Sequence, residues 1–402
     1  MEKNMVSFFE KFLTKDSIFL DKKVLQANYT PNKILHREQE IEQIAQVLAP
    51  ALRREKPSNL FIYGKTGTGK TVCVKYTTNN ILEVASKNKI PLRIVYINCK
   101  LKRVADTEYR LIAQLATEFG KAIPATGLPT DEVYKIFFNA LDSKEQIIIL
   151  VLDEIDQLAK KAGDAILYNL TRINEELNRA QLSIVGISND LVFVDNLDPR
   201  VKSSLSEEEI LFPPYNALQI QDILYERAKK AFKKDALGEG VIEKCAAYAA
   251  REHGDARRAL ELLRVAAEIA ERKGLSKVSL NHIDEAEEKI ERERILDAVQ
   301  TQPKQFQVVL YSVLKLSEKN KPIIFTGEIY DFYKSLCDKI NLRPLTQRRV
   351  SDVLAELDML GIINAKVISK GRYGRTREIT LSTSHEITNK LKELLEKELE
   401  IS

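Results

Sequence analysis

Short apolar runs alternate with longer segments of helical spacing over the first half of the chain. The most apolar run, residues 147–152, is unbroken, which is typical of a parallel strand buried on both faces. Shorter runs predict further strands at residues 60–63, 92–98, 182–187 and 209–212. Strands that alternate with helices along a chain indicate an α/β domain built on a parallel sheet, here a sheet of five strands.

The segments between these runs carry apolar residues at the spacing of helices. In this half of the chain, helices are expected at residues 41–54, 71–84, 100–142 with a break at 123–129, and 165–177. From Ala217 to about Arg294 the pattern is helical throughout, with glycines as punctuation, which predicts a small helical domain beside the sheet. The segment Gln300-Thr301-Gln302-Pro303 is the best candidate for a linker.

The C-terminal part of the chain predicts a third kind of domain. An apolar face with helical spacing indicates a helix over residues 346–360, with Thr346 as its N-cap. Helices at 304–318 and 326–340 precede it, and strands at 364–369 and 376–381 and an amphipathic helix at 386–399 follow it. Three helices and a glycine-rich hairpin indicate a winged helix-turn-helix.

The residues after the first predicted strand, Gly64-Lys65-Thr66-Gly67-Thr68-Gly69-Lys70-Thr71, fit the phosphate-binding pattern G-x-x-x-x-G-K-[ST] at every required position. The glycines let backbone N–H groups converge on phosphate oxygens, and the following helix adds the positive end of its dipole. We expect Lys70 to reach the β- and γ-phosphates of a nucleoside triphosphate and the Thr71 hydroxyl to ligate Mg²⁺. The alternative is a chance glycine turn, but the flanking strand and helix are the context that the motif requires.

Two acidic residues, Asp153 and Glu154, follow the most apolar run directly. Because α/β sheets bind ligands at the carboxyl ends of their strands, both side chains are expected beside the phosphate loop. We expect Asp153 to hold Mg²⁺ and Glu154 to orient and polarise the water that attacks the γ-phosphate. An acidic start to a helix is the alternative, since Asp and Glu favour that position.

Three further polar residues are candidates for the γ-phosphate end of the site. Asn189 ends the next buried strand and could hydrogen-bond the γ-phosphate or the attacking water, although Asn after a strand is also common in turns. Arg257, at the start of a helix in the helical domain, and Arg200 could stabilise transition-state charge as an arginine finger does. A surface salt bridge is the alternative for both arginines, and Arg200 could require a neighbouring subunit.

The predicted helix 346–360 and the hairpin after it carry groups suited to nucleic acid. Glutamine and arginine can pair with base edges in the major groove, and serine can bond a phosphate. The helix exposes Gln347, Arg348 and Ser351 opposite its apolar face. The hairpin is basic with an interleaved aromatic ring, and its candidates for DNA contact are Lys370, Arg372, Tyr373 and Arg375. A solvated basic hairpin or a winged helix that contacts protein is the alternative.

Composition excludes some classes of partner and site. The chain has 402 residues and a net charge of only +4, so a nucleic-acid surface must be a local patch. The four cysteines include no C-x-x-C pair, so neither a zinc site nor a disulfide framework is indicated. Charges interrupt the N-terminal apolar residues, where Met5–Leu13 is expected to form a short amphipathic helix, and no stretch approaches the length of a membrane span. We therefore expect a cytoplasmic protein with no membrane partner.

The order of four motifs, together with a helical lid, resembles that of AAA+ ATPases. The motifs are the phosphate loop, Asp153-Glu154, Asn189 and the segment Gly254-Asp255-Ala256-Arg257. With the predicted C-terminal winged helix, the chain most resembles the archaeal replication initiators, relatives of the eukaryotic origin-recognition and cell-division-cycle-six proteins. On that pattern Asn189 is the sensor-one residue, Arg257 the sensor-two arginine and Arg200 the finger candidate.

The resemblance also adds candidate contacts outside the loop. Tyr29-Thr30-Pro31 and His36-Arg37-Glu38 look like the family's segment beside the adenine, so Tyr29 and Arg37, together with Tyr215, are candidate nucleotide contacts. The family has an initiator-specific helical insertion that distorts the DNA duplex, and this places Arg103 and Arg110 among the candidate DNA contacts. It also implies bound ATP or ADP with Mg²⁺ and slow ATP hydrolysis.

The resulting prediction is an AAA+ α/β domain over residues 1–214, a helical lid over 215–298 and a winged-helix domain over 299–402. The implied function is a nucleoid-associated, ATP-dependent replication initiator that binds origin duplex DNA. Its further partners would be the replicative minichromosome-maintenance helicase and other initiator copies or paralogues. A clamp-loader or helicase-loader ATPase and a nucleotide-sensing winged-helix transcriptional regulator remain alternatives.

Overall fold

The computed structural model describes residues 16–26, 29–100, 107–124, 126–205, 207–318, 323–369 and 375–401. The predicted helix at Met5–Leu13 lies outside these residues. The chain divides into two compact units, Met1–Ile283 and Asp284–Ser402, and each has its own hydrophobic core. None of the described helices is both long enough and apolar enough to cross a membrane.

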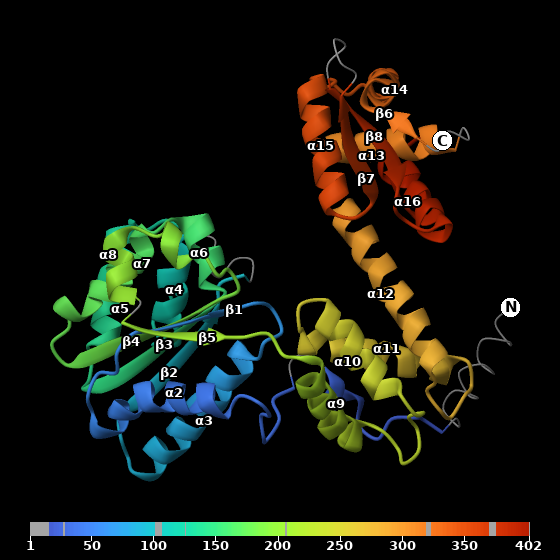
Figure 1. Ribbon diagram of the computed structural model, residues 1–402. Helices are drawn as coiled ribbons and strands as arrows, with labels where there is room; N and C mark the ends of the chain where they lie inside the picture. The colour runs from blue at the N-terminus through green and yellow to red at the C-terminus, as the bar shows by residue number, and fades with distance from the viewer. Residues whose placement is uncertain are drawn as a thin grey trace, which may run out of the picture. The chain divides into compact units, whose positions relative to one another are not determined.

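The first unit contains the predicted parallel sheet of five strands, in the spatial order β2-β3-β4-β1-β5 (Figure 1). The strands are β1 Leu60–Gly64, β2 Leu92–Asn98, β3 Gln146–Asp153, β4 Ala180–Ser188 and β5 Glu208–Phe212. Strand β3 is the most apolar run of the sequence, and it is buried along its whole length between β2 and β4. Helices cover both faces of the sheet, and this explains why the sequence of β3 is apolar at successive positions and does not alternate with polar residues.

Two cores lie on opposite faces of this sheet. Leu150 of β3 packs in the core formed with α4 to α8, and Ile149 packs in the core formed with α2 and α3. The helices on the two faces are α2 Glu38–Leu48, α3 Lys70–Lys87, α4 Glu108–Glu118, α5 Thr130–Leu141, α6 Ile155–Ala162, α7 Ala165–Arg172 and α8 Pro199–Leu205. The short helices α6 and α8 were not predicted, since neither is long enough to show a repeated apolar spacing.

A helical lid completes the first unit. It consists of α9 Ala217–Ala231, α10 Val241–Arg251, α11 Ala256–Arg272 and the start of α12 Leu280–Gln300. A capping box of Asn216 and Gln219 begins α9, and the Asp255 carboxylate caps the N-terminus of α11 by accepting from the backbone N–H groups of Arg257 and Arg258. Residues 16–26, with the 3₁₀ helix η1 Lys22–Leu25, pack against α9 and α11.

The second unit has the helices and hairpin predicted from the apolar spacing. Its elements are α13 Lys304–Ser317, β6 Ile324–Phe325, α14 Thr326–Lys339, α15 Gln347–Met359, β7 Ile363–Ser369, β8 Arg375–Leu381 and α16 His385–Glu398. Thr346 caps α15 as expected, by accepting from the Arg349 backbone N–H. The two-residue strand β6 was not predicted; it pairs antiparallel with β8 and makes a sheet of three strands.

Candidate functional site

The glycine loop lies between the end of β1 and the start of α3. Lys70 is the first residue of α3, and its ammonium donates to the Gly64 and Lys65 carbonyl oxygens, both at 2.7 Å. Burial, followed by the nearby charge of Arg257, lowers the pKa of Lys70 to about 8. The loop therefore holds a buried cation at the end of a helix whose first backbone N–H groups can bind an anion.

Two glycines of the loop are required by close neighbours from other elements. Gly67 has φ +73°, and a Cβ there would lie 1.7 Å from the Asp255 carboxylate of the lid. Gly69 has φ +95°, and a Cβ there would lie 2.7 Å from the Tyr215 hydroxyl. The Ala256 backbone N–H also donates to the Gly67 carbonyl oxygen at 3.3 Å. The lid thus touches the loop directly through the N-terminus of α11.

The two predicted magnesium ligands meet at the carboxyl end of β3. The Thr71 hydroxyl donates to the Asp153 carboxylate at 3.0 Å, and the Tyr96 hydroxyl of β2 donates to the same carboxylate oxygen. Burial is the largest cause that raises the pKa of Tyr96, so this hydroxyl remains a donor at neutral pH. A hydroxyl and a carboxylate side by side are oxygen ligands of the kind that Mg²⁺ prefers.

Glu154 follows Asp153 in an unusual backbone conformation. Its φ of +56° is left-handed, which non-glycine residues adopt at a cost of about 1–3 kcal/mol. Its backbone N–H donates to the Asp153 carboxylate at 3.0 Å, and its own carboxylate lies 3.7 Å from the Lys100 ammonium. The turn sends the Glu154 side chain into the same cavity as Asp153, instead of continuing the line of the strand.

Two cavities meet at the glycine loop. The smaller, of about 270 Å³, is lined by polar groups from β2, β3, α3 and α11 and by the residue that follows β4. Its lining residues are Gly67, Gly69, Lys70, Thr71, Lys75, Tyr96, Asn98, Asp153, Glu154, Asn189 and Arg257. Sequence-predicted residues from four separate motifs are therefore brought together, as we expected of Lys70, Thr71, Asp153, Glu154, Asn189 and Arg257.

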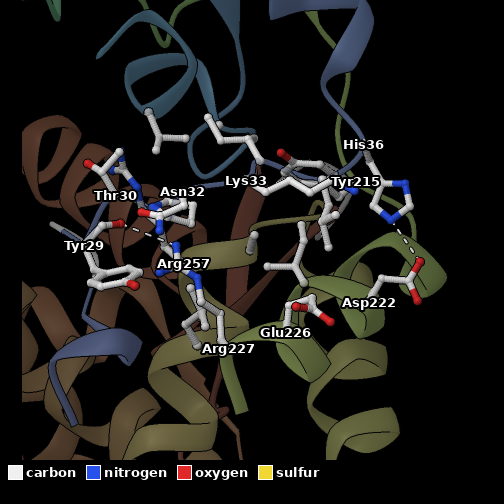
Figure 2. Close-up of a pocket in the computed structure, with 18 of the residues that line it drawn as sticks. Tyr29, Thr30, Asn32, Lys33, His36, Tyr215, Asp222, Glu226, Arg227 and Arg257 are labelled. Atoms are coloured by element: carbon white, nitrogen blue, oxygen red, sulfur yellow. Dashed lines mark hydrogen bonds and ion pairs between the residues drawn. The ribbon is translucent and has the colours of Figure 1, made fainter. Parts of the chain in front are cut away.

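The larger cavity, of about 780 Å³, shares part of the glycine loop and Arg257 with the smaller one. Tyr29 and Tyr215, both predicted to contact nucleotide, line it together with residues of α9 (Figure 2). Its volume is typical of a site for a small molecule or cofactor. The two cavities form one site with a phosphate-binding loop in the middle, a cluster of acidic and amide groups on one side and a larger, partly aromatic space on the other.

Arg37, a predicted nucleotide contact, is hydrogen-bonded to the glycine loop itself. Its guanidinium is buried beneath the loop, where it donates to the Thr68 and Pro213 carbonyl oxygens and lies over the Tyr215 ring. It is not among the described residues that line either cavity. Arg37 therefore supports the loop through its backbone, and a direct contact with nucleotide stays a prediction.

Arg200 lies outside the smaller cavity. It is in α8, its side chain is 72% exposed, and it makes a two-point contact with the Asp198 carboxylate at 3.1 and 3.0 Å. The Tyr168 ring lies 5.2 Å from its guanidinium. Within one chain, Arg200 therefore forms a surface salt bridge, the alternative to its predicted role as an arginine finger.

Sequence reasoning missed the residues that β2 contributes to the cavity. Asn98 is paired in register with Asp153, and Tyr96 is two residues before it on the same face of the strand. Lys75, one helical turn after Thr71, was also missed, and its ammonium lies 4.4 Å from the Tyr96 ring. Finding Tyr96 and Asn98 would have required knowing that β2 lies next to β3 in the sheet.

The predicted DNA contacts are only partly within the described residues. Gln347 and Arg348 are exposed in the first turn of α15, and the Ser351 hydroxyl donates to the Gln347 carbonyl oxygen at 3.0 Å. Arg110 is partly buried in α4. Arg103, Lys370, Arg372, Tyr373 and the side chain of Arg375 lie outside the described residues.

Comparison with known proteins places these parts in one family. Residues 53–192 match the AAA domain, residues 221–288 the Cdc6 AAA+ ATPase-type lid domain, and residues 297–390 the CDC6 C-terminal winged helix domain. The predicted fold class, an AAA+ sheet with a helical lid and a winged helix, is thereby confirmed.

Individual relatives cover almost the whole chain. An ORC1-type DNA replication protein of Thermococcus onnurineus is 55% identical over 388 residues, which are 95% of this chain and 93% of the relative. The protein of the same name from Pyrococcus furiosus is 54% identical over 389 residues, 96% of this chain and 92% of the relative. The solved Aeropyrum pernix ORC1 protein in complex with DNA is 45% identical, with a TM-score of 0.82 and coverage of 95% and 98%. This chain belongs to the family of ORC1-type DNA replication proteins.

Proposed function

We propose that the chain binds ATP with Mg²⁺ at the glycine loop and hydrolyses it slowly. The contact of Thr71 with Asp153 at 3.0 Å, in a cavity that Glu154 also lines, is the observation that carries this proposal. Lys70 would bind the β- and γ-phosphates, and Thr71 and Asp153 would hold the metal ion. Glu154 would accept a proton from the attacking water, with Asn189 and Arg257 beside the γ-phosphate.

We further propose that the nucleotide controls the lid as a switch. Asp255 and Ala256 at the start of α11 contact Gly67, and Arg257 lines both cavities from the same helix end. A γ-phosphate therefore changes the charge that faces the first turn of α11. Because a ligand shifts a conformational equilibrium only by its differential affinity for the two states, contacts made to both loop and lid suit this role.

The chain is proposed to bind duplex DNA at replication origins through its winged helix and to help recruit the replicative helicase. Exposed Gln347 and Arg348 at the start of α15 offer donors of the kind that pair with base edges. The relative from Aeropyrum pernix, 45% identical, was solved in complex with DNA. Occupancy across a genome, measured by footprinting, tests this proposal: origins are expected, and promoters would favour a transcriptional regulator instead.

Replacing Arg348 with alanine is expected to weaken binding to the specific duplex about tenfold, because a base or phosphate partner is lost at the start of the recognition helix. The salt dependence of binding should become less steep if the lost partner is a phosphate. Fluorescence anisotropy with labelled duplexes at several salt concentrations measures both effects.

The matched control for this experiment is Arg294→Ala. Arg294 is another exposed arginine of the same unit, with a side chain that is 67% exposed and paired with Glu291 on α12. It should change the affinity for duplex less than twofold. Equal losses in the two variants would show that Arg348 contributes only general positive charge.

A loader ATPase that assembles into a ring is the second candidate, and the exposed position of Arg200 is the observation that favours it. If Arg200 completes the site of a neighbouring copy, turnover per chain should rise with protein concentration in the wild type and stay flat in Arg200→Ala. ATP affinity should be unchanged in the variant. Sedimentation with ATP distinguishes the ring from a monomer, and a concentration-independent wild-type rate would exclude the role in trans.

A further inference from the structure

The larger cavity is bounded on one side by residues 29–36, which together with residues 16–26 and Arg37 are called the strap here and precede the sheet. Tyr29, Thr30, Asn32 and Lys33 of this strap line the cavity, and so do several residues of α9 (Figure 2). The glycine loop occupies the side where phosphates bind. The strap and α9 therefore make the wall that a ribose and base would meet.

One end of the strap is attached to the lid. The Leu20 backbone N–H donates to the Ala231 carbonyl oxygen at 2.8 Å, and the Phe19 and Phe232 rings stack with centroids 5.1 Å apart. The Lys22 ammonium lies 2.6 Å from the Glu268 carboxylate of α11. Val24 and Leu25 are also almost completely buried, so this segment of the strap is packed firmly against the lid.

The other end of the strap is attached to the sheet. Arg37 donates to the Thr68 carbonyl oxygen of the glycine loop at 2.9 Å and to the Pro213 carbonyl oxygen after β5. Residues 29–36, which precede the second attachment, line the cavity. A ligand in the cavity is thus in contact with a segment that joins the lid to the loop.

Arg227 holds the middle of the strap. It projects from α9 into the cavity beside the Tyr29 ring (Figure 2). Its guanidinium donates to the Val24 and Tyr29 carbonyl oxygens at 3.2 and 3.4 Å and lies 4.5 Å from the centroid of the Tyr29 ring. The planar guanidinium donates from two separate nitrogens while its flat face lies on the ring, a geometry that the single ammonium nitrogen of a lysine does not reproduce.

We propose that Arg227 is the positioning residue that couples an occupied base end of the cavity to the lid. It fixes the strap and the Tyr29 ring against α9, so the base packs against a wall that belongs to the lid. Arg257 would then couple the phosphate end of the ligand to the lid, and Arg227 would couple the base end to it. This inference rests on the proposed ATP-binding function.

Two ligands can distinguish the phosphate end of the cavity from its base end. Inorganic tripolyphosphate occupies only the phosphate end, whereas ATP occupies both. Arg227→Ala is expected to weaken ATP binding about tenfold or more, because the strap and the Tyr29 ring would no longer be held in place for the base before it binds, and to change tripolyphosphate affinity less than twofold. Isothermal titration calorimetry of the full chain measures both affinities.

Hydrogen exchange supplies a readout of the coupling itself. In the wild type, ATP should slow amide exchange in residues 16–26 and in α9, and tripolyphosphate should not. In Arg227→Ala the ATP effect on residues 16–26 should disappear. Arg227→Lys keeps the charge but loses the second donor nitrogen and the flat face on the Tyr29 ring, so it should show the same loss in weaker form. It carries the test if the alanine variant does not fold.

Arg251→Ala is the matched control. Arg251 is an exposed lid arginine that also lies over a tyrosine ring, 5.4 Å from the Tyr248 centroid, but it is not among the residues that line the cavity. It should leave both affinities and the exchange pattern unchanged. Equal weakening of ATP and tripolyphosphate by Arg227→Ala, or unchanged ATP affinity, would overturn the inference. A wild type that does not bind ATP would instead overturn the proposed function.

Discussion

Replacing Glu154 with glutamine is expected to lower kcat for ATP hydrolysis by about a hundredfold or more, with ATP affinity unchanged within about threefold. Glutamine has nearly the same shape and can still orient a water molecule, but its amide cannot accept a proton. Glu154 lines the smaller cavity with Thr71 and Asp153 and does not contact either of them through its carboxylate in the described interactions. The loss should therefore fall on the chemical step and leave binding intact.

A single-turnover assay with labelled ATP, together with equilibrium binding of the same nucleotide, separates the two effects. Glu175→Gln is the control, because Glu175 is a carboxylate of the same unit that is 66% exposed and paired with Arg172. Its turnover should equal that of the wild type. Equal rates for Glu154→Gln and the wild type would remove Glu154 from the proton-accepting role.

The sheet could be predicted because local sequence and tertiary environment agree there. The run over β3 is apolar at every position from Ile147 to Leu152, and that pattern has few solutions other than a strand covered on both faces. The predicted helix at residues 41–54 was less accurate: α2 ends at Leu48 and continues as a 3₁₀ helix over Ala49–Arg53, with Pro50 near its start. Proline removes a backbone donor, so the regular α-helical hydrogen bonding stops there.

The parts of the site that consist of contiguous residues could be predicted from the sequence. The glycine loop and Asp153-Glu154 carry their own local context of strand, turn and helix. Tyr96 and Arg227 could not be found in this way, since each acts through a partner far away in sequence, Asp153 and Tyr29 respectively. For Arg37 the position along the chain was informative, but the direction of its side chain depends on carbonyl groups at Thr68 and Pro213, which the sequence pattern does not show.

Replacing Lys70 with alanine is expected to abolish measurable ATP binding, weakening affinity by about a hundredfold or more. Hydrogen bonds to charged groups contribute about 1.5–3 kcal/mol each, and Lys70 would make them to two phosphates, while 1.4 kcal/mol corresponds to a tenfold change in affinity. The ammonium now donates to the Gly64 and Lys65 carbonyl oxygens. These contacts exchange for phosphate oxygens on binding, so their loss in the variant costs the free protein some loop stability as well.

Lys65→Ala separates this effect from a general loss of positive charge. Lys65 belongs to the same loop, but its side chain is exposed and is not among the described residues that line either cavity. Calorimetry should show ATP affinity within about threefold of the wild type for Lys65→Ala and no detectable heat for Lys70→Ala. If the two variants weaken binding equally, the loop attracts nucleotide only by its charge, and a specific binding site for the β- and γ-phosphates is excluded. If Lys70→Ala alone fails to bind, the buried ammonium is the group that makes this glycine loop a triphosphate site, and the proposed hydrolysis and the proposed switch of the lid both depend on it.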